Sequence, residues 1–125
     1  VGFCVLGGIF SEGVDLTGES LIGAIIVGTG LPQIGSEREI LKEYYDRKKQ
    51  SGFDYAYRYP GMNKFLQAAV RVIRTKEDKG VILLLDDRFL RRDYGEIFPR
   101  EWKDRSSCRL NNVEEAVSRF WRSFT

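Results

Sequence analysis

Three apolar runs along the chain predict the strands of a sheet. They cover residues 2–10 (GFCVLGGIF), 21–27 (LIGAIIV) and 81–85 (VILLL). None of these runs alternates regularly between polar and apolar positions, and continuous apolar runs are typical of parallel strands that are buried on both faces. We therefore expect an α/β fold with a mainly parallel central sheet and helices on both faces.

Two further segments carry the signals of a helix start followed by helical spacing. Ser36 followed by Glu39 has the form of a capping box, in which the serine hydroxyl accepts the amide of residue 39, and this helix would end near Gly52. Asn112 with Glu115 repeats the capping pattern for a last helix. The apolar stripe of this last helix is expected to be buried, and it consists of Val113, Ala116, Val117, Phe120, Trp121 and Phe124.

The segment from residue 60 to residue 74 (PGMNKFLQAAVRVIR) predicts a helix with an unusual polar face. At ~100° per residue, Gln67, Arg71 and Arg74 project from one side, and the segment contains no acidic residue that could pair with them. A solvated surface is the plain interpretation of such a face. The alternative is a phosphate site, because guanidinium groups stay charged and offer two donors at once. The tyrosine-rich residues 52–60 before this helix are interpreted as a connector.

Composition restricts the chemistry further. The 125 residues include no histidine and two cysteines, which excludes Ser-His-Asp triads, Cys-His pairs and metal sites built on histidine or on four cysteines. No apolar run approaches the ~20 residues of a membrane span, and so few cysteines favour a reduced compartment. We expect a cytoplasmic protein with no metal in this chain and no membrane partner.

A glycine-containing loop after the first apolar run is the second candidate for chemistry. Glycines in this position let the backbone approach a ligand closely, and Glu12 and Asp15 supply acceptors for hydroxyl groups. Most loops of this kind are simple turns. The chain contains no GxxxxGK[ST] motif, so the loop cannot cradle a triphosphate as a P-loop does.

Together, the loop and the arginine-bearing segment resemble motifs V and VI of the DinG/XPD-like branch of superfamily-2 helicases. Residues 8–15 (GIFSEGVD) resemble motif V, and residues 67–74 (QAAVRVIR) resemble the QxxGRxxR pattern of motif VI. Residues 30–32 (GLP) resemble the short stretch between the two motifs, and residues 78–88 resemble the family's continuation after motif VI. Val70 stands where the family usually has glycine.

The resemblance implies that residues 1–125 are part of the C-terminal RecA-like domain of an ATP-dependent DNA helicase, a class of enzyme used in DNA repair. It implies that Arg71 and Arg74 are arginine fingers for the γ-phosphate of ATP, and that Gln67 orients the same region. ATP and its Mg²⁺ would be bound mainly by the first RecA-like lobe of the same protein. An arginine supplied across an interface contributes ~10³–10⁵ in rate in related hydrolases.

The resemblance also implies roles for the residues of motif V. Glu12, Gly13 and Asp15 would lie at the nucleotide between the two lobes. Phe10 and Ser11 would connect the loop to the path of single-stranded DNA, which is the second expected partner. The expected function is thus ATP hydrolysis coupled to translocation along single-stranded DNA, with this chain as the second motor lobe.

The chain begins at Val1, directly with strand-like residues, and we expect it to be an N-terminally truncated piece of a longer protein. We expect this piece to be inactive by itself. Two other interpretations stay open. One is a non-catalytic α/β module that binds nucleotide or nucleic acid through degenerate helicase motifs, which Val70 favours. The other is a small phosphate-binding protein that uses the glycine loop together with Arg71 and Arg74.

Overall fold

A computed structural model describes residues 1–6 and 21–125 of the chain, which form two units, residues 1–86 and residues 87–125. The strand expected over residues 2–10 is not found in its described part, because residues 1–6 are irregular and mostly exposed. A strand needs a neighbour that pairs its amides and carbonyls, and no described segment pairs with residues 1–6. Within the described residues, no helix is both long enough and apolar enough to cross a membrane.

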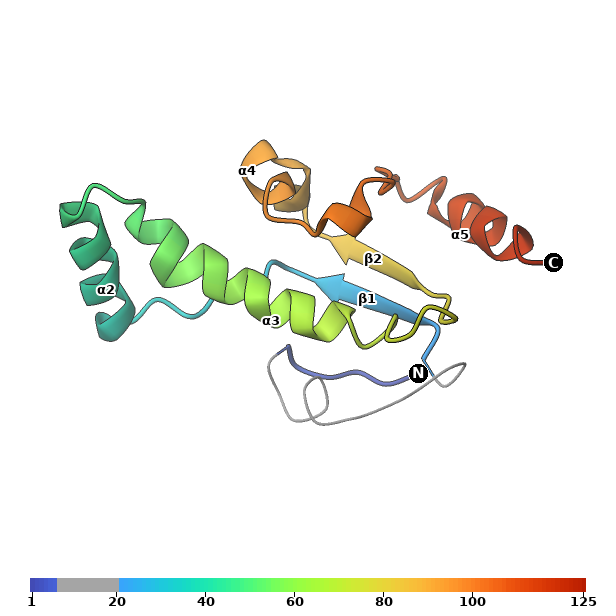
Figure 1. Ribbon diagram of the computed structural model, residues 1–125, viewed down its shortest axis with the longest axis horizontal. Helices are drawn as coiled ribbons and strands as arrows, with labels where there is room; N and C mark the ends of the chain where they lie inside the picture. The colour runs from blue at the N-terminus through green and yellow to red at the C-terminus, as the bar shows by residue number, and fades with distance from the viewer. Residues whose placement is uncertain (7–20) are drawn as a thin grey trace. The chain divides into compact units, whose positions relative to one another are not determined.

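The first unit contains a two-stranded parallel sheet (Figure 1). Strand β1 (Gly23–Val27) pairs with β2 (Val81–Leu85), and the register runs from Gly23 opposite Val81 to Val27 opposite Leu85. Both strands lie where the apolar runs predicted them, and the parallel pairing is confirmed. The chain between them forms a crossover through helices, as parallel neighbours require.

The two faces of β1 differ in burial, which limits the expectation of helices on both sides. Ile26 is buried, whereas Ile25 and Val27 on the opposite face are 64% and 75% exposed. Successive side chains of a strand point to opposite faces, so one face of β1 joins the core and the other stays open. The prediction of a sheet covered on both faces is therefore wrong for β1 as the structure describes it.

Helix α2 (Ser36–Arg47) begins where the sequence predicted, but a different group caps it. Gly35 is the cap residue, and its carbonyl accepts the Glu39 amide at 3.0 Å; the Ser36 side chain makes no cap hydrogen bond. The predicted capping box is wrong because Ser36 is already the first helical residue, so its hydroxyl is one position too late. The Glu39 carboxylate accepts the Tyr57 hydroxyl at 2.5 Å instead.

The tyrosine-rich residues 52–60 are helical, so their interpretation as a connector is wrong. Residues 52 and 53 begin the helix, a π-helical turn η2 (Asp54–Arg58) follows, and α3 (Tyr59–Ala69) continues it. The predicted helix began at Pro60, which instead lies inside the observed one and lacks the amide that would bond to the carbonyl of Ala56. That carbonyl accepts Nη1 of Arg38 from α2 at 2.9 Å, so a residue far away in sequence satisfies it.

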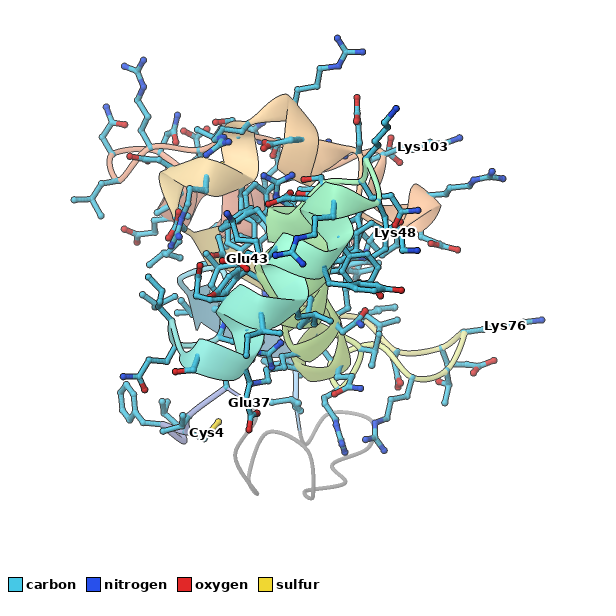
Figure 2. All side chains as sticks on the ribbon, turned by 90° about the vertical axis from the view of Figure 1, so that its left-hand side faces the viewer. Cys4, Glu37, Glu43, Lys48, Lys76 and Lys103 are labelled. Atoms are coloured by element: carbon cyan, nitrogen blue, oxygen red, sulfur yellow. The ribbon has the colours of Figure 1, made fainter. Side chains whose placement is uncertain are left out.

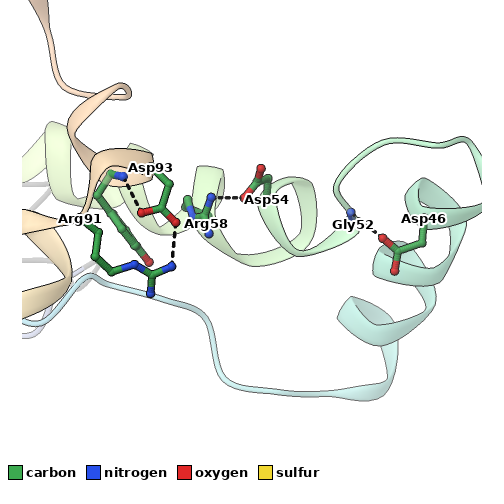
Figure 3. A network of polar contacts seen from close by, with 7 residues as sticks. Asp46, Gly52, Asp54, Arg58, Arg91 and Asp93 are labelled. Carbon is green, nitrogen blue, oxygen red and sulfur yellow. Dashed lines mark hydrogen bonds and ion pairs between the residues drawn. The ribbon is translucent and has the colours of Figure 1, made fainter.

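Aromatic rings join α2 to the π-helical turn. Tyr45 stacks on Tyr55 with ring centroids 4.5 Å apart, and Tyr55 meets Tyr59 edge to face at 5.2 Å. Inside the turn, Arg58 pairs with Asp54 at 2.5 Å (Figure 3). These contacts hold α2 against the start of the long helix, which consists of residues 52 and 53, η2 and α3. The core side of α3 is formed by Met62, Phe65 and Ala69, which are buried.

The second unit contains an aromatic cluster and several short helical segments. These are η3 (Asp87–Leu90), α4 (Arg92–Gly95), η4 (Arg100–Trp102) and α5 (Val113–Arg122). The cluster is formed by Phe89, Tyr94 and Phe98, all of which are buried. Ring centroids of Phe89 lie 6.1 Å from Tyr94 and 5.9 Å from Phe98.

Helix α5 departs from the prediction in two ways. Asn112 is its cap residue, but the side-chain oxygen accepts the Arg109 amide at 2.8 Å and does not cap the helix. None of the described residues of α5 is buried, so the predicted burial of its apolar stripe is wrong. The aromatic residues of the stripe pack on one another, and the ring centroid of Phe120 lies 5.1 Å from that of Trp121 and 5.0 Å from that of Phe124.

Candidate functional site

The arginine-bearing segment leaves the helix earlier than predicted. Helix α3 ends at Ala69, and the next amides make the shorter bonds of a tight turn, from Arg71 to the Ala68 carbonyl at 3.3 Å and from Val72 to the Ala69 carbonyl at 3.1 Å. Three of the four residues that follow Ala69 are β-branched, which disfavours continued helix, and Val72 among them is 2% exposed. The prediction of one helix through residue 74 is therefore wrong beyond Ala69.

The three predicted residues nevertheless come together. Gln67, on the last turn of α3, lines an open hollow in the surface together with Arg71 and Arg74 from the segment that follows. The remaining lining residues are Val70 and Ile73. The hollow thus combines two guanidinium groups and one amide with a small apolar patch, a set that suits an anion bearing several oxygens.

Val70 lies at the surface of this hollow. Its side chain is 56% exposed, and the residue occupies the first position after α3. A glycine here would present no side chain to a ligand, so the branched side chain adds bulk where the QxxGRxxR pattern that this segment resembles has none.

A turn closed by Asp78 follows the hollow. One carboxylate oxygen of Asp78 accepts the amides of Arg74 at 2.9 Å and of Thr75 at 2.8 Å, and the Asp78 amide donates to the Thr75 carbonyl at 3.3 Å. These backbone donors favour the ionised form and lower the pKa of Asp78 below its ordinary value. The Lys76 side chain at the tip of the turn projects away from it (Figure 2).

Sequence reasoning missed this use of Asp78. The residue contributed to the family resemblance, but no bonding role was expected of it. A usable signal existed, because aspartate side chains often accept backbone amides of neighbouring residues in turns. It was hidden by the expectation that residue 74 belongs to a helix, whose own carbonyls would have taken that amide.

The turn returns to the sheet at Gly80. A Cβ atom at this position would lie 2.2 Å from Cγ1 of Val72 and 3.1 Å from the carbonyl oxygen of Ile22, so only glycine fits. The next amide, of Val81, donates to the same Ile22 carbonyl at 3.0 Å. The segment that carries the arginines is therefore anchored at Val72 on one side and at the start of β2 on the other.

A second position where only glycine fits lies just after β1. Gly28 and Gly30 have φ angles of 85° and 66°, and Thr29 between them is 1% exposed. A Cβ atom at Gly30 would lie 2.7 Å from Cδ2 of Leu6 and 3.1 Å from the Gly61 carbonyl oxygen of α3. The GLP stretch of the sequence thus needs glycine both for its backbone conformation and for its contact with α3.

The other predicted site residues are Phe10, Ser11, Glu12, Gly13 and Asp15, and all of them lie outside the described residues. The structure therefore places the motif VI part of the candidate site and not the motif V part. Among the residues that it describes, no group of three or more acidic or cysteine side chains lies close enough together to hold a metal ion.

Comparison with known proteins finds a family described as "Helicase C-terminal domain", whose pattern matches residues 1–105. The chain is 32% identical over 126 residues to the "Regulator of telomere elongation helicase 1 homolog" of Caenorhabditis briggsae, a match that covers 92% of this chain and 12% of that protein. It is 32% identical over 108 residues to "ATP-dependent DNA helicase YoaA" of Haemophilus influenzae, with 83% and 17% covered.

A third relative is "ATP-dependent DNA helicase DinG" of Photobacterium profundum, which is 36% identical over 90 residues, covering 70% of this chain and 13% of that protein. The chain therefore spans less than a fifth of the length of each of these three relatives.

Proposed function

This chain belongs to the helicase C-terminal domain family, in its DinG/XPD-like branch, and from that premise we propose that it is the second motor lobe of an ATP-dependent DNA helicase. In this proposal the lobe has the RecA-like fold, and its parallel β1–β2 pair with a helical crossover supports that assignment. The first lobe of the same protein holds most of the contacts to ATP and Mg²⁺. Single-stranded DNA is the track.

The observation that carries the proposal is the hollow that gathers Gln67, Arg71 and Arg74. Phosphoryl transfer needs positive charge held where negative charge develops on the transferred group, and it needs little covalent chemistry from the protein. Two guanidinium groups beside an amide fit that need. The hollow is open, which suits a site that is completed by a surface of the other lobe.

We assign the roles of the three residues by their place in the hollow. Arg71 and Arg74 are the fingers that approach the γ-phosphate, and Gln67, four residues before Arg71, orients the same phosphate or the attacking water. By the same proposal, Glu12, Gly13 and Asp15 approach the nucleotide, whereas Phe10 and Ser11 approach the DNA.

The test replaces Arg74 by alanine in the full-length helicase that contains this chain. We expect DNA-stimulated ATP hydrolysis to fall by about 10³-fold or more, with binding of single-stranded DNA unchanged, because the finger acts mainly in the transition state. Arg47→Ala is the matched control, since its side chain is 82% exposed on α2. ATP hydrolysis that survives Arg74→Ala intact rejects the finger assignment.

The isolated 125-residue chain should not hydrolyse ATP, because the proposed lobe supplies charge to a nucleotide that is bound mostly elsewhere. Phosphate release is measured with the purified chain and with its Arg74→Ala variant. Release that exceeds the buffer rate and disappears in the variant would contradict the proposal, because the chain would then contain a complete site.

A second candidate function is a non-catalytic nucleotide- or nucleic-acid-binding module, and the exposed Val70 in the hollow favours it. Its branched side chain occupies surface next to both arginines, where it would crowd a phosphate. Val70→Gly in the full-length protein separates the two candidates. If the module is non-catalytic, ATP hydrolysis is absent before this substitution and appears after it; if the lobe is a motor, hydrolysis is present before it.

A further inference from the structure

Arg74 is not held in place by helix α3. The helix ends at Ala69, and the tight-turn bonds that follow it reach only to the Val72 amide. The amide of Arg74 donates to the Asp78 carboxylate at 2.9 Å, and the neighbouring Thr75 amide donates to the same oxygen at 2.8 Å. The direction of the backbone at Arg74 is therefore set by a side chain four residues further along.

The rest of the segment explains why this contact matters. Val72 is fixed in the core beneath Gly80, and Val81 is fixed in the sheet by its bond to Ile22. Between these anchors the chain makes an exposed turn. Asp78 joins its two ends, because the carboxylate takes the amide on the incoming side and the Asp78 amide returns a bond to the Thr75 carbonyl at 3.3 Å.

We propose that Asp78 is a positioning residue for Arg74, whose carboxylate orients the Arg74 backbone and thereby places the guanidinium group in the hollow. The inference rests on the proposed function, in which Arg74 reaches the γ-phosphate. It adds a residue that touches neither ATP nor DNA but on which the finger depends.

The chemistry of the contact suits a rigid support. An ionised carboxylate is an acceptor with no donor of its own, and hydrogen bonds to it are about twice as strong as bonds between neutral groups. Asp78 is ionised at neutral pH, as an ordinary aspartate is, and the two backbone amides favour that form and lower its pKa further. A misplacement of about 1 Å at a reacting group costs up to about 10²-fold in rate, so loosening this turn should be visible in turnover.

The experiment uses the full-length helicase with Asp78→Ala. We expect kcat of DNA-stimulated ATP hydrolysis to fall by about 10–100-fold, while KM for ATP and the affinity for single-stranded DNA stay within about threefold, because the finger acts in the transition state. Asp78→Asn keeps an acceptor oxygen and loses the charge, so we expect it to lose about 3–10-fold. An unchanged kcat in Asp78→Ala overturns the inference.

Asp46 provides a matched control. Its carboxylate, on α2, accepts the backbone amide of Gly52 at the start of the long helix at 2.8 Å (Figure 3), so Asp46→Ala removes the same kind of contact away from the hollow. We expect Asp46→Ala to lower thermal stability and to leave kcat unchanged. If Asp46→Ala and Asp78→Ala lower kcat equally, the effect is general destabilisation and the positioning role is wrong.

A double variant connects Asp78 to its target. If Asp78 acts through Arg74, then Arg74→Ala with Asp78→Ala loses no more activity than Arg74→Ala alone; additive losses overturn the inference. Should Asp78→Ala fail to fold, Asp78→Asn is combined with Arg74→Ala and judged by the same rule. The two proposals fail differently: an Arg74→Ala variant with full activity rejects the finger, whereas a large loss in Arg74→Ala with none in Asp78→Ala rejects only the positioning role.

Discussion

Lys49 is a lysine in a backbone conformation that favours glycine. Its φ angle is 59°, the one positive value at a non-glycine residue in the part of the chain that the structure describes. It lies just after α2, where the Gln50 amide donates to the Tyr45 carbonyl at 3.0 Å and the Lys49 amide donates to the Asp46 carbonyl at 3.1 Å. This is the bonding of a Schellman motif, whose left-handed position is usually glycine.

The expected gain from Lys49→Gly follows from two opposing terms. A side chain in the left-handed region costs about 1–2 kcal/mol, which glycine does not pay. Glycine loses more backbone entropy on folding, which costs about 0.5–1 kcal/mol. The two ranges differ by about 0–1.5 kcal/mol with a central value near ~0.75 kcal/mol in favour of Lys49→Gly, which corresponds to an increase in Tm of roughly 3 °C for a chain of this size.

The neighbouring lysine is the control, because it makes the same change of charge and composition. Lys48 has an ordinary φ of –81°, and its ammonium group lies 5.6 Å from the Tyr44 ring centroid. Lys48→Gly should lower the free energy of unfolding by about 0.5–1 kcal/mol through backbone entropy, and by a little more through the lost contact with the ring. Urea and thermal unfolding of the chain measure the stability change in each of the two variants. If the two variants shift stability in the same direction, the reasoning from φ is refuted.

Three further predictions concern the contacts around the long helix and the arginine-bearing segment. Arg38→Ala should lower the free energy of unfolding by about 1–3 kcal/mol in urea titrations, because a carbonyl of the long helix loses its donor. Gly80→Ala should cost about 1–3 kcal/mol in the same assay, since the added carbon would overlap Val72; an unchanged midpoint would show that the turn moves freely. The hydrogen bond from the Tyr57 hydroxyl to Glu39 raises the pKa of Tyr57 above its ordinary value of 10, so the bond stabilises the fold fully below pH 10 and less as the pH rises through the raised pKa. Tyr57→Phe should therefore flatten the alkaline decline in the free energy of unfolding. An identical decline in the unchanged chain and in Tyr57→Phe would contradict this prediction.

The sequence was a good guide where the signal is local. Continuous apolar runs located β1 and β2, and the parallel pairing followed from their character. The start of α2 was correct although its cap was not, since the capping residue differed by one position. Gln67, Arg71 and Arg74 were expected to share a surface, and they do, even though two of them lie beyond the helix that was expected to carry them.

The errors concern hydrogen bonds and burial that hydrophobic spacing along the chain does not determine. Residues 52–60 were interpreted as a tyrosine-rich connector, but they are helical, and Arg38 from another helix donates to the Ala56 carbonyl within them. The segment after Ala69 looked helical because its apolar spacing continues, but the amides of Arg71 and Val72 form tight-turn bonds and the Arg74 amide donates to the Asp78 carboxylate. The stripe on α5 has the spacing of a buried face and is not buried, because periodicity identifies an apolar face and does not supply the surface that covers it.

The sequence by itself therefore determined which residues could do chemistry, where the strands lie, and that the chain resembles the second lobe of a helicase. The tertiary structure decided where the helix before the arginines ends and which group holds the backbone of Arg74. The physical reason is that hydrophobic spacing predicts only which residues share a face of a helix or strand. Each backbone carbonyl and amide, in contrast, bonds to whichever donor or acceptor the folded chain brings within about 3 Å of it. Asp78 is such a partner, and only the folded chain places its carboxylate beneath the Arg74 amide.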